Sequence, residues 1–382
     1  MFGRTPILLL LATLALAACQ TVAQPGRHRT PRQDRPARRD RPPRQNRPRS
    51  SPSGDPVIVT GAIPLTDLVR EDGVADTYLG FAGGLYFASN EVPAEHAAFG
   101  AETARQIQPL DASGAPSQNG AIGLMSISMS NATQEWCHVR STGAPNDAPC
   151  YPHTFMGQAA DDPSLSGNLV IINGARGGQA LDHWDEPSDA EYTRIATEVL
   201  PAFGLTEAQV QIVWVKVALK DEPSRPSLPD LQADAFVTEA TIGNVVRALR
   251  VRYPNLQQVF FTSRIYGGWA EPDRNSPEPW AYETGFGTKW AIEAQITQRA
   301  TGVVDEEAGD LDGMPFMAWG PYVWSYGDRP REDGLMWPND LFTGGGIHPN
   351  EDGARIVANY LLDFFKTAPF TRCWFLDGLT CS

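Results

Sequence analysis

Three short segments of the chain contain the residue types that acyl transfer requires. Ser130 supplies a hydroxyl group, residues 173–178 form a glycine-rich turn with the sequence Asn-Gly-Ala-Arg-Gly-Gly, and His348 is followed by Pro349. Acyl transfer needs a hydroxyl nucleophile, an imidazole that takes its proton, and backbone N–H groups that bind the oxyanion. The sequence therefore predicts this chemistry if the fold brings the three segments together.

Each of these residues also has a purely structural explanation. A serine at a strand-to-helix turn commonly caps the helix, and Ser130 could do only that. The glycines of the turn are equally explained by backbone geometry, and most histidines in loops, as His348 would be, have no catalytic role. The order of the three segments along an α/β pattern favours the catalytic interpretation.

Short apolar runs alternate with amphipathic segments, and this alternation indicates which elements position the three segments. Several of the runs are apolar on both faces, as buried parallel strands are. The runs are residues 121–129, 168–173, 210–219, 258–263 and 314–319. Strands that alternate with helices predict a three-layer α/β/α sandwich with a central parallel sheet. Ligands bind such sheets beyond the carboxyl ends of the strands, where Ser130 and the turn at 173–178 are expected.

Four helices are predicted around these strands. A capping-box pattern at residues 188–191 opens a helix that ends near Leu200. Further helices are expected at 234–252 and at about 288–298, and Asn350 is the expected N-cap of the last helix. In this last helix one apolar stripe faces the sheet, formed by Val357, Tyr360, Leu361, Phe364 and Phe365.

In the order of these segments, residues 120–365 resemble the SGNH (GDSL-type) hydrolase superfamily. Residues 128–131, Ser-Met-Ser-Asn, stand where the family has Gly-Asp-Ser or, in its sialate O-acetylesterase-like branch, Gly-Gln-Ser-Asn. The turn at 173–178 is similar to that branch's second block, and His348-Pro349 is similar to the family's last block. The resemblance implies a flavodoxin-like fold and a serine esterase, with carbohydrate O-acetylesterases among the relatives.

The same resemblance implies a role for individual residues. Ser130 would be the nucleophile and His348 the general base, while the N–H groups of Ser130 and Gly178 would bind the oxyanion. Asn131 and Arg176 lie in the matching blocks and are candidate substrate contacts, although Arg176 is as well explained by a pair with an acid. No cofactor and no metal are implied, and no chemical role is assigned to residues 263–266.

Two positions depart from the family pattern. The family has Asp three residues before the histidine, where this chain has Gly345, and it has an oxyanion-binding Asn near the position of Leu219. Asp340 is the candidate replacement acid; Glu351 and Asp352 are alternatives, although first-turn helix charges also explain them. Lys216 is either an edge-strand residue or, if it points into the site, an oxyanion donor in place of the missing Asn.

Two functions follow from this pattern. The first is a cell-envelope serine esterase that hydrolyses acetyl or other short acyl esters, carried by a carbohydrate or a small molecule. The second is a catalytically impaired protein of the same fold that binds glycan or cell-wall material, because Gly345 and Leu219 replace family residues. A monomer is expected in either case.

The N-terminus has the order of a secretory signal. Arg4 precedes an apolar run that is too short to span a bilayer and ends in residues 16–19, Leu-Ala-Ala-Cys. These four residues resemble a bacterial lipobox, so residues 1–18 are expected to be a lipoprotein signal peptide and Cys19 its acylated residue; the alternative is an ordinary signal peptide. We expect an exported protein anchored by lipid in the cell envelope, in the outer membrane of a Gram-negative host because Gln20 follows the cysteine.

Residues 19–53 are predicted to be a disordered tether between this anchor and a single hydrolase domain at 54–382. The first 50 residues contain 11 Arg and two Asp, so residues 51–382 have 20 basic and 43 acidic residues, a net charge of −23. So acidic a domain would repel phosphate, which argues against a nucleic-acid partner. The arginines of the tether either keep it soluble or bind anionic lipid or wall polymer.

Cysteine usage fits an exported chain. With Cys19 assigned to lipidation, four of the five cysteines remain, and an even number predicts two disulfides. The local pairings Cys137–Cys150 and Cys373–Cys381 close the shortest loops. The alternative is a zinc site, whose spacing would differ from that of standard zinc modules, formed by residues 137, 138, 150 and 153 (Cys, His, Cys and His).

Overall fold

The computed structural model describes residues 61–70, 72–139, 143–220, 223, 225–271 and 274–381. The chain divides into two units, 1–47 and 48–382, and every described residue belongs to the second. The predicted signal peptide, the lipidated Cys19 and the Arg/Pro-rich tether all lie outside the described residues. Within the described ranges, no helix is both long enough and apolar enough to cross a membrane.

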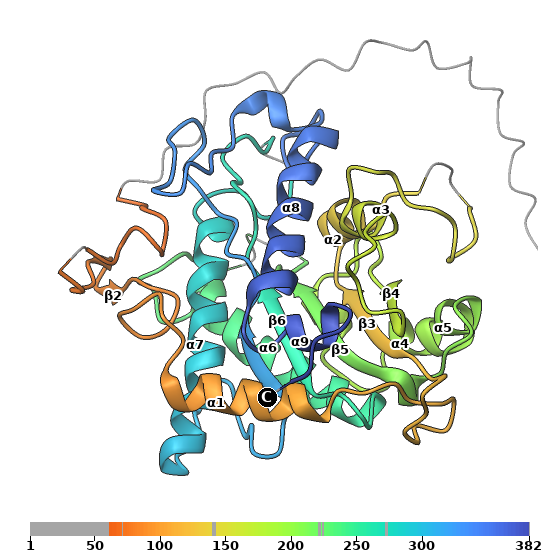
Figure 1. Cartoon of the computed structure of the whole chain (residues 1–382). Helices are drawn as coiled ribbons and strands as arrows, with labels where there is room; N and C mark the ends of the chain where they lie inside the picture. The colour runs from red at the N-terminus through yellow and green to blue at the C-terminus, as the bar shows by residue number, and fades with distance from the viewer. Residues whose placement is uncertain are drawn as a thin grey trace, which may run out of the picture. The chain divides into compact units, whose positions relative to one another are not determined.

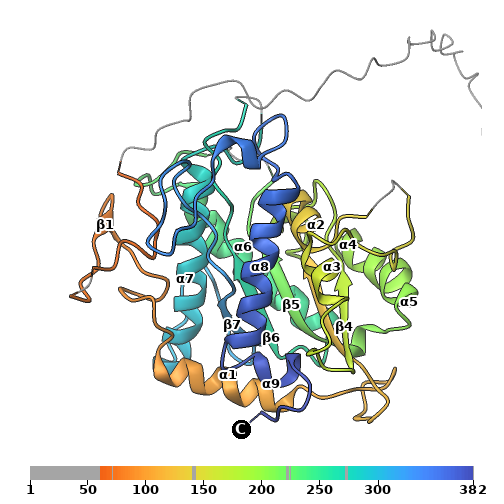
Figure 2. The same cartoon turned by 45° about the horizontal axis from the view of Figure 1, so that its top comes forward.

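Five parallel strands form the central sheet, in the order β4-β3-β5-β6-β7 (Figure 1; β7 is labelled in Figure 2). They are β3 (Ile122–Ile127), β4 (Leu169–Asn173), β5 (Val210–Lys216), β6 (Gln258–Thr262) and β7 (Phe316–Trp319). All residues of β3, β5, β6 and β7 are buried, as expected for strands covered by helices on both faces. Each apolar run of the sequence forms one strand, so the predicted parallel α/β/α sandwich is confirmed.

Helices cover both faces of the sheet (Figures 1 and 2). On one face α2 (Ser130–Trp136) and α3 (Phe155–Ala159) pack against α8 (Glu351–Thr367). On the other face α6 (Asp234–Arg252) packs against α7 (Trp280–Thr301). Along the sheet, the step from β3 to β4 runs in one direction and the steps from β5 to β6 and β7 run in the other. Because parallel strands are joined by right-handed crossovers, the helices of the two directions lie on opposite faces.

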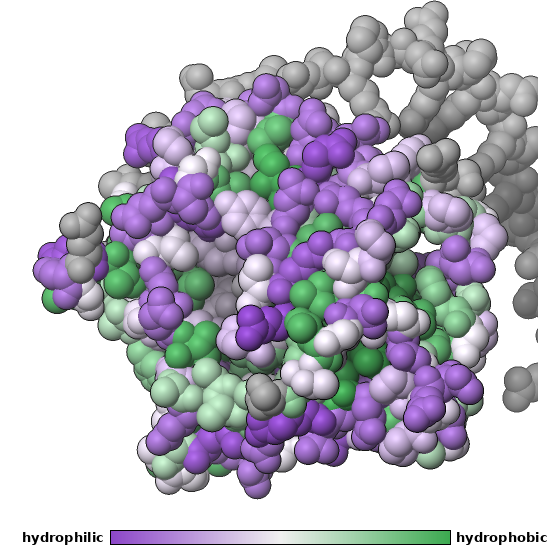
Figure 3. Space-filling view, viewed as in Figure 1, coloured by the Kyte–Doolittle hydropathy of each residue, from purple (hydrophilic) through white to green (hydrophobic). Residues whose placement is uncertain are grey.

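The remaining elements are short or lie at the margins of the sheet. α1 (Ala94–Gln106) packs against β6 and β7, and a two-stranded antiparallel ribbon is formed by β1 (Thr77–Tyr78) and β2 (Phe81–Ala82). The others are α4 (Ala190–Arg194), η2 (Ile195–Val199), α5 (Leu200–Ala202), α9 (Arg372–Phe375), η1 (Leu181–His183), η3 (Glu207–Gln209) and η4 (Asn339–Leu341). On the face shown in Figure 3, hydrophilic residues predominate and hydrophobic ones form scattered patches.

The predicted helices are found, with two corrections. α6 has the predicted bounds, and α8 follows Asn350, whose side chain accepts hydrogen bonds from the N–H groups of Asp352 and Gly353. α7 begins eight residues earlier than predicted. Its first part contains glycines, which are needed for close packing of two helices: a Cβ on Gly287 would lie 2.4 Å from the carbonyl oxygen of Ala235 in α6.

The capping box predicted at residues 188–191 is wrong. Asp189 is the N-cap residue of α4, and no side chain caps this end. The Glu191 carboxylate is instead bound by Arg194 at 2.6 Å and by Arg176 at 3.1 Å. The segment from α4 to α5 is helical, but it includes a π-helical turn at residues 195–199.

Both predicted disulfides are present, Cys137–Cys150 and Cys373–Cys381. The cysteines of the alternative zinc site are therefore bonded to each other, and within the described ranges no group of three or more potential ligands could hold a metal ion.

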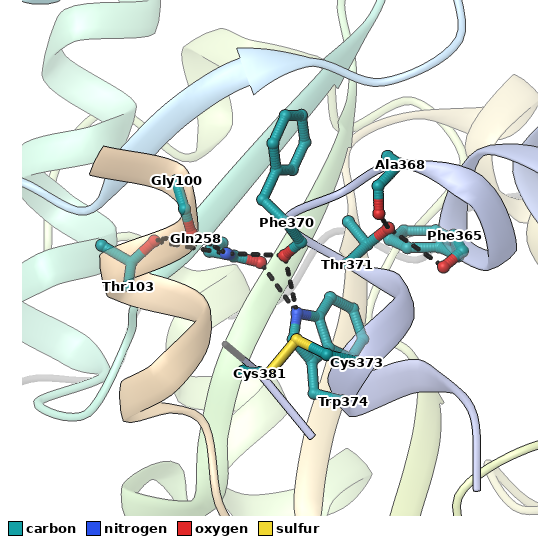
Figure 4. The surroundings of a disulfide bond; sticks show 10 residues. All are labelled: Gly100, Thr103, Gln258, Phe365, Ala368, Phe370, Thr371, Cys373, Trp374 and Cys381. Carbon is teal, nitrogen blue, oxygen red and sulfur yellow. Dashed lines mark hydrogen bonds between the residues drawn. A yellow bond between two sulfur atoms is a disulfide. The ribbon is translucent and has the colours of Figure 1, made fainter. Parts of the chain in front are cut away.

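The second disulfide lies beside a buried hydrogen-bond network at the start of β6 (Figure 4). Gln258 donates to the carbonyl oxygens of Gly100 and Phe370 and accepts from Nε1 of Trp374. The side chain of one strand residue thus ties α1 and the C-terminal segment to the sheet.

Candidate active site

Ser130 is placed at the carboxyl end of the sheet by a sharp turn after β3. Ser128 has a φ of +99°, a region that non-glycine residues seldom occupy, and its carbonyl oxygen accepts the N–H of Arg176 at 2.9 Å. This bond joins the end of β3 to the glycine-rich turn that follows β4. Ser130 then begins α2, which lies beside the first turns of α8 (Figure 2).

The Oγ atom of Ser130 lies 2.7 Å from Nε2 of His348, although the two residues are 218 positions apart in the sequence. When the imidazole holds its proton on Nδ1, Nε2 accepts a hydrogen bond from this hydroxyl, which is the arrangement that a general base requires. Met129, not Ser130, is the N-cap residue of α2, and the Ser130 side chain caps no N–H group. The structural explanation of Ser130 as a helix cap is therefore wrong.

Asn131 joins the two segments that position Ser130 and His348. Its amide nitrogen donates to the carbonyl oxygen of Ile347 at 3.1 Å, and its amide oxygen accepts from Nη1 of Arg264 at 2.6 Å. The residue is 1% exposed. Asn131 was expected to contact substrate, but both ends of its amide are bound to protein, so its position suits a residue that aligns the site.

Behind Asn131 lies a buried ion pair. Nζ of Lys216, at the end of β5, is 2.9 Å from the Glu135 carboxylate on α2, and both side chains are 0% exposed. Burial raises the pKa of Glu135 and lowers the pKa of Lys216, and the attraction between the two charges opposes both shifts. Both predictions for Lys216 are wrong: β5 lies inside the sheet, and the ammonium group is bound to Glu135 instead of facing an oxyanion.

Burial, together with the positive charges of Arg264 and Arg274, lowers the pKa of His348 to about 4. Within the part of the chain that the structure describes, none of the three candidate acids binds this imidazole. Asp340 is exposed and contributes its backbone carbonyl to Asn350, so the prediction that it replaces the missing acid is wrong. Glu351 lies 4.0 Å from Nδ1 of His153, and Asp352 donates its backbone N–H to the capping side chain of Asn350.

The position where the family has an acid faces a positive charge. Gly345 has a φ of +95°, and a Cβ built on it would lie 3.3 Å from Nε of Arg274. Arg274 is itself paired with Glu271 at 3.1 Å. The loop that precedes His348 therefore packs against a guanidinium group where the resemblance predicts a carboxylate.

Backbone N–H groups are available on the other side of Ser130. Gly178 has a φ of +80° and lines the same pocket as Ser130, and a Cβ on Gly177 would lie 3.8 Å from that of Ser130. Among the described residues, no protein acceptor binds the N–H groups of Ser130 and Gly178. Leu219 lines this pocket at the place where an Asn was expected, and it supplies no side-chain donor.

The pocket has a volume of about 270 Å³ and is lined by two kinds of side chain. The apolar ones are Met129, Ala180, Ala218, Leu219 and Ile347. Arg264, Arg274 and Lys220 are basic, and no acidic side chain lines the pocket within the described ranges. The apolar side chains suit a small acyl group, and the basic ones attract a negative charge.

Arg176 is fixed outside this pocket. Its Nη1 lies 3.1 Å from the Glu191 carboxylate, which confirms the pairing interpretation for this residue. Sequence analysis missed Arg264, Arg274 and Glu135. Arg264 is the second residue after β6, so the rule that functional residues lie beyond strand ends could have identified it. The other two had no such signal.

No family model matches the sequence, and no curated protein matches it. Among solved structures, the chain is similar to an acetylxylan esterase from Geobacillus stearothermophilus, with 14% identity over 64% of this chain and 95% of the other, at a TM-score of 0.35. It is also similar to an alpha/beta hydrolase from the metagenome of Lake Arreo, with 15% identity over 68% and 99% and a TM-score of 0.37.

A member of the lipolytic G-D-S-L family from Veillonella parvula is similar at 9% identity over 65% of this chain and 100% of the other, with a TM-score of 0.35. At such low identities and TM-scores, these similarities do not transfer an activity to this chain.

Proposed function

We propose that this protein is an SGNH-type serine esterase that removes acetyl or other short acyl groups, with a carbohydrate as the acyl carrier. The observation that supports this most directly is the 2.7 Å contact between Oγ of Ser130 and Nε2 of His348, beside a small pocket at the carboxyl end of a parallel sheet. No cofactor takes part in this mechanism. With its predicted signal peptide and lipidated Cys19, the enzyme would act as a monomer anchored in the cell envelope.

The reaction would proceed through an acyl-enzyme. Oγ of Ser130 attacks the ester carbonyl while Nε2 of His348 takes the hydroxyl proton, and the N–H groups of Ser130 and Gly178 bind the oxyanion. The imidazolium returns this proton to the departing alcohol. A water molecule, deprotonated in turn by His348, then hydrolyses the acyl-enzyme and restores Ser130.

The charges around the pocket define the substrate further. The small volume and the apolar lining residues suit an acetyl group, and the basic side chains of Arg264, Arg274 and Lys220 favour an alcohol that bears a negative charge near the ester. An acetylated acidic sugar has both properties.

A second candidate function is supported by one observation. An imidazole whose pKa is about 4 is a weak base, and no carboxylate among the described residues binds it. A non-catalytic protein that binds glycan or cell-wall material in the same pocket would have this electrostatic environment.

Turnover of p-nitrophenyl acetate and of acetylated xylan tests both functions. We expect Ser130→Ala to lower kcat/KM by at least about 10³-fold, because removal of a nucleophile abolishes the covalent route. Ser113→Ala, in an exposed loop, is the matched control and should be fully active. Equal rates for wild type and Ser130→Ala would remove Ser130 from the mechanism; no turnover and no fluorophosphonate labelling, together with glycan binding, would favour the second function.

A further inference from the structure

A second pocket, of about 770 Å³, lies away from Ser130 between β2, α6, α7 and the loop 303–307. It shares no lining residue with the candidate active site. Four aromatic residues line it, Phe81, Phe87, Phe236 and Trp290, and three of their rings pack together. The ring of Trp290 is stacked on Phe236 with centroids 5.0 Å apart, and Phe81 lies 5.2 Å from Trp290.

The other lining groups are acidic. Glu239, Glu293, Asp305, Glu306 and Glu307 all line the pocket, and within the described ranges no Lys, Arg or His does. Glu293 is partly neutralised by Lys289 on the same helix, with 3.5 Å between the charged atoms. The pocket therefore combines an aromatic surface with an excess of negative charge, and we call it the carboxylate pocket.

Glu239 is the feature that points to a ligand. Glu239 belongs to α6, is only 5% exposed, and lines the carboxylate pocket. Within the part of the chain that the structure describes, it has no hydrogen-bond or ion-pair partner. Burial and the negative charges of Asp305, Glu307 and Glu293 raise its pKa to about 8. A buried carboxyl group without a partner is costly, and a cation in the pocket would remove much of that cost.

We propose that the carboxylate pocket binds an organic ammonium ion, with the charged nitrogen against Glu239 and its alkyl groups over Phe236 and Trp290. Aromatic faces attract alkylammonium ions through their π electrons, and nearby carboxylates add a direct charge attraction. Within the described ranges no set of side chains has the arrangement of a metal site, and the three rings offer no metal ligand. The exposed Leu231 and Val303 extend the apolar contact at the rim.

This site is independent of the proposed esterase activity, and calorimetry on the full chain tests it. Choline is the probe, and 3,3-dimethyl-1-butanol, which has the same shape without the charge, is its matched ligand control, both at 0.15 M salt and at pH 9, where Glu239 is ionised. We expect choline to bind at least tenfold more tightly than the neutral alcohol. Equal affinities, or no measurable choline binding, would overturn the proposal.

Two variants complete the test. At pH 9, above its raised pKa, Glu239 is ionised. Glu239→Gln keeps the size of the side chain and removes this charge, so we expect at least a tenfold loss of choline affinity at that pH. Glu95→Gln, on the exposed surface of α1, is the control and should bind choline as the wild type does. Thermal unfolding checks that both variants fold. If Glu239→Gln folds and keeps its affinity, or if Mg²⁺ displaces choline at equal concentration, the pocket is a general acidic surface and the proposal is wrong.

Discussion

At the scale of single residues, the candidate site is defined by what surrounds His348. Nε2 of its imidazole lies 2.7 Å from the hydroxyl oxygen of Ser130, while the charged groups that act on its pKa, Arg264 and Arg274, are positive. Both charges disfavour the imidazolium that forms when Ser130 loses its proton. The same two arginines attract a negatively charged substrate, whose charge would offset this effect once bound.

The pH dependence of turnover follows from this environment. Because the pKa of His348 is about 4, the base is neutral above this pH, and we expect the acidic limb of kcat/KM near pH 4 instead of near 6.5. Arg274→Gln removes a positive charge and should move the limb to higher pH, whereas Arg70→Gln, an exposed residue paired with Asp72 and Asp76, should not. A wild-type limb between pH 6 and 7 would contradict this environment.

Asn131 allows a second prediction at this scale. Asn131→Asp has no N–H group to donate to the carbonyl oxygen of Ile347, although it can still accept from Arg264. Since this bond aligns the loop that ends at His348, we expect kcat to fall by about 10- to 100-fold, with a smaller change in KM. Kinetics of p-nitrophenyl acetate hydrolysis measure both. An unchanged kcat would show that the bond does not position the base.

At the scale of elements, α2 is fixed in two ways. Its first residues contact the loop before α8, and its last turn carries Glu135, which is paired with Lys216 of β5 beneath the site. A buried pair of this kind contributes little net stability but is costly to break, because one charge then remains in an apolar environment. The pair therefore fixes how α2 sits on the sheet.

This reasoning predicts the effect of breaking the pair. Lys216→Met should lower the free energy of unfolding by about 3 to 5 kcal/mol, since the Glu135 carboxylate loses its closest counter-charge. The double variant Glu135→Leu/Lys216→Met should recover a large part of this loss. Urea unfolding at pH 7 measures both values. A double variant less stable than Lys216→Met would contradict this prediction, because it would show that the attraction between the two charges exceeds the cost of removing them from water.

At the scale of the whole molecule, several buried carboxyl groups have raised pKa values. Burial raises the pKa of Glu239 to about 8, that of Glu283 to about 8 and that of Glu278 to about 7. In the unfolded chain these groups lose their protons near pH 4.5, so from pH 5 to about 7 these three groups hold more protons in the folded protein than in the unfolded one. Their contribution to stability is complete below about pH 4.5 and is lost as the pH rises toward the raised pKa values.

Thermal unfolding between pH 5.5 and 9 tests this coupling. Each such carboxyl contributes a loss of up to about 1.4 kcal/mol per pH unit until its folded pKa is reached. Glu239→Gln removes one titrating group, so its stability should fall less steeply than that of the wild type over the same range. Parallel curves for the two proteins would contradict the raised pKa of Glu239.

Local patterns in the chain were enough to predict the strands, the parallel α/β/α sandwich, both disulfides and the start of the last helix at Asn350. They also predicted that Ser130 and His348 meet, because parallel strands deliver their carboxyl ends to one edge of a sheet. The periodicity of apolar residues and the spacing of capping residues predict such features well, since strand burial and helix capping depend on residues close in sequence.

The partners of individual side chains could not be predicted in this way. Asp340, the expected acid, is exposed, and Lys216 binds Glu135 of another element. The carboxylate pocket is formed by residues of β2, α6, α7 and a loop that are far apart in the sequence. Burial, pKa and charge pairing depend on atoms that are distant in sequence and close in space. The packing of α2 on β5 and of α6 on α7 sets these properties, and no local pattern in the chain encodes them.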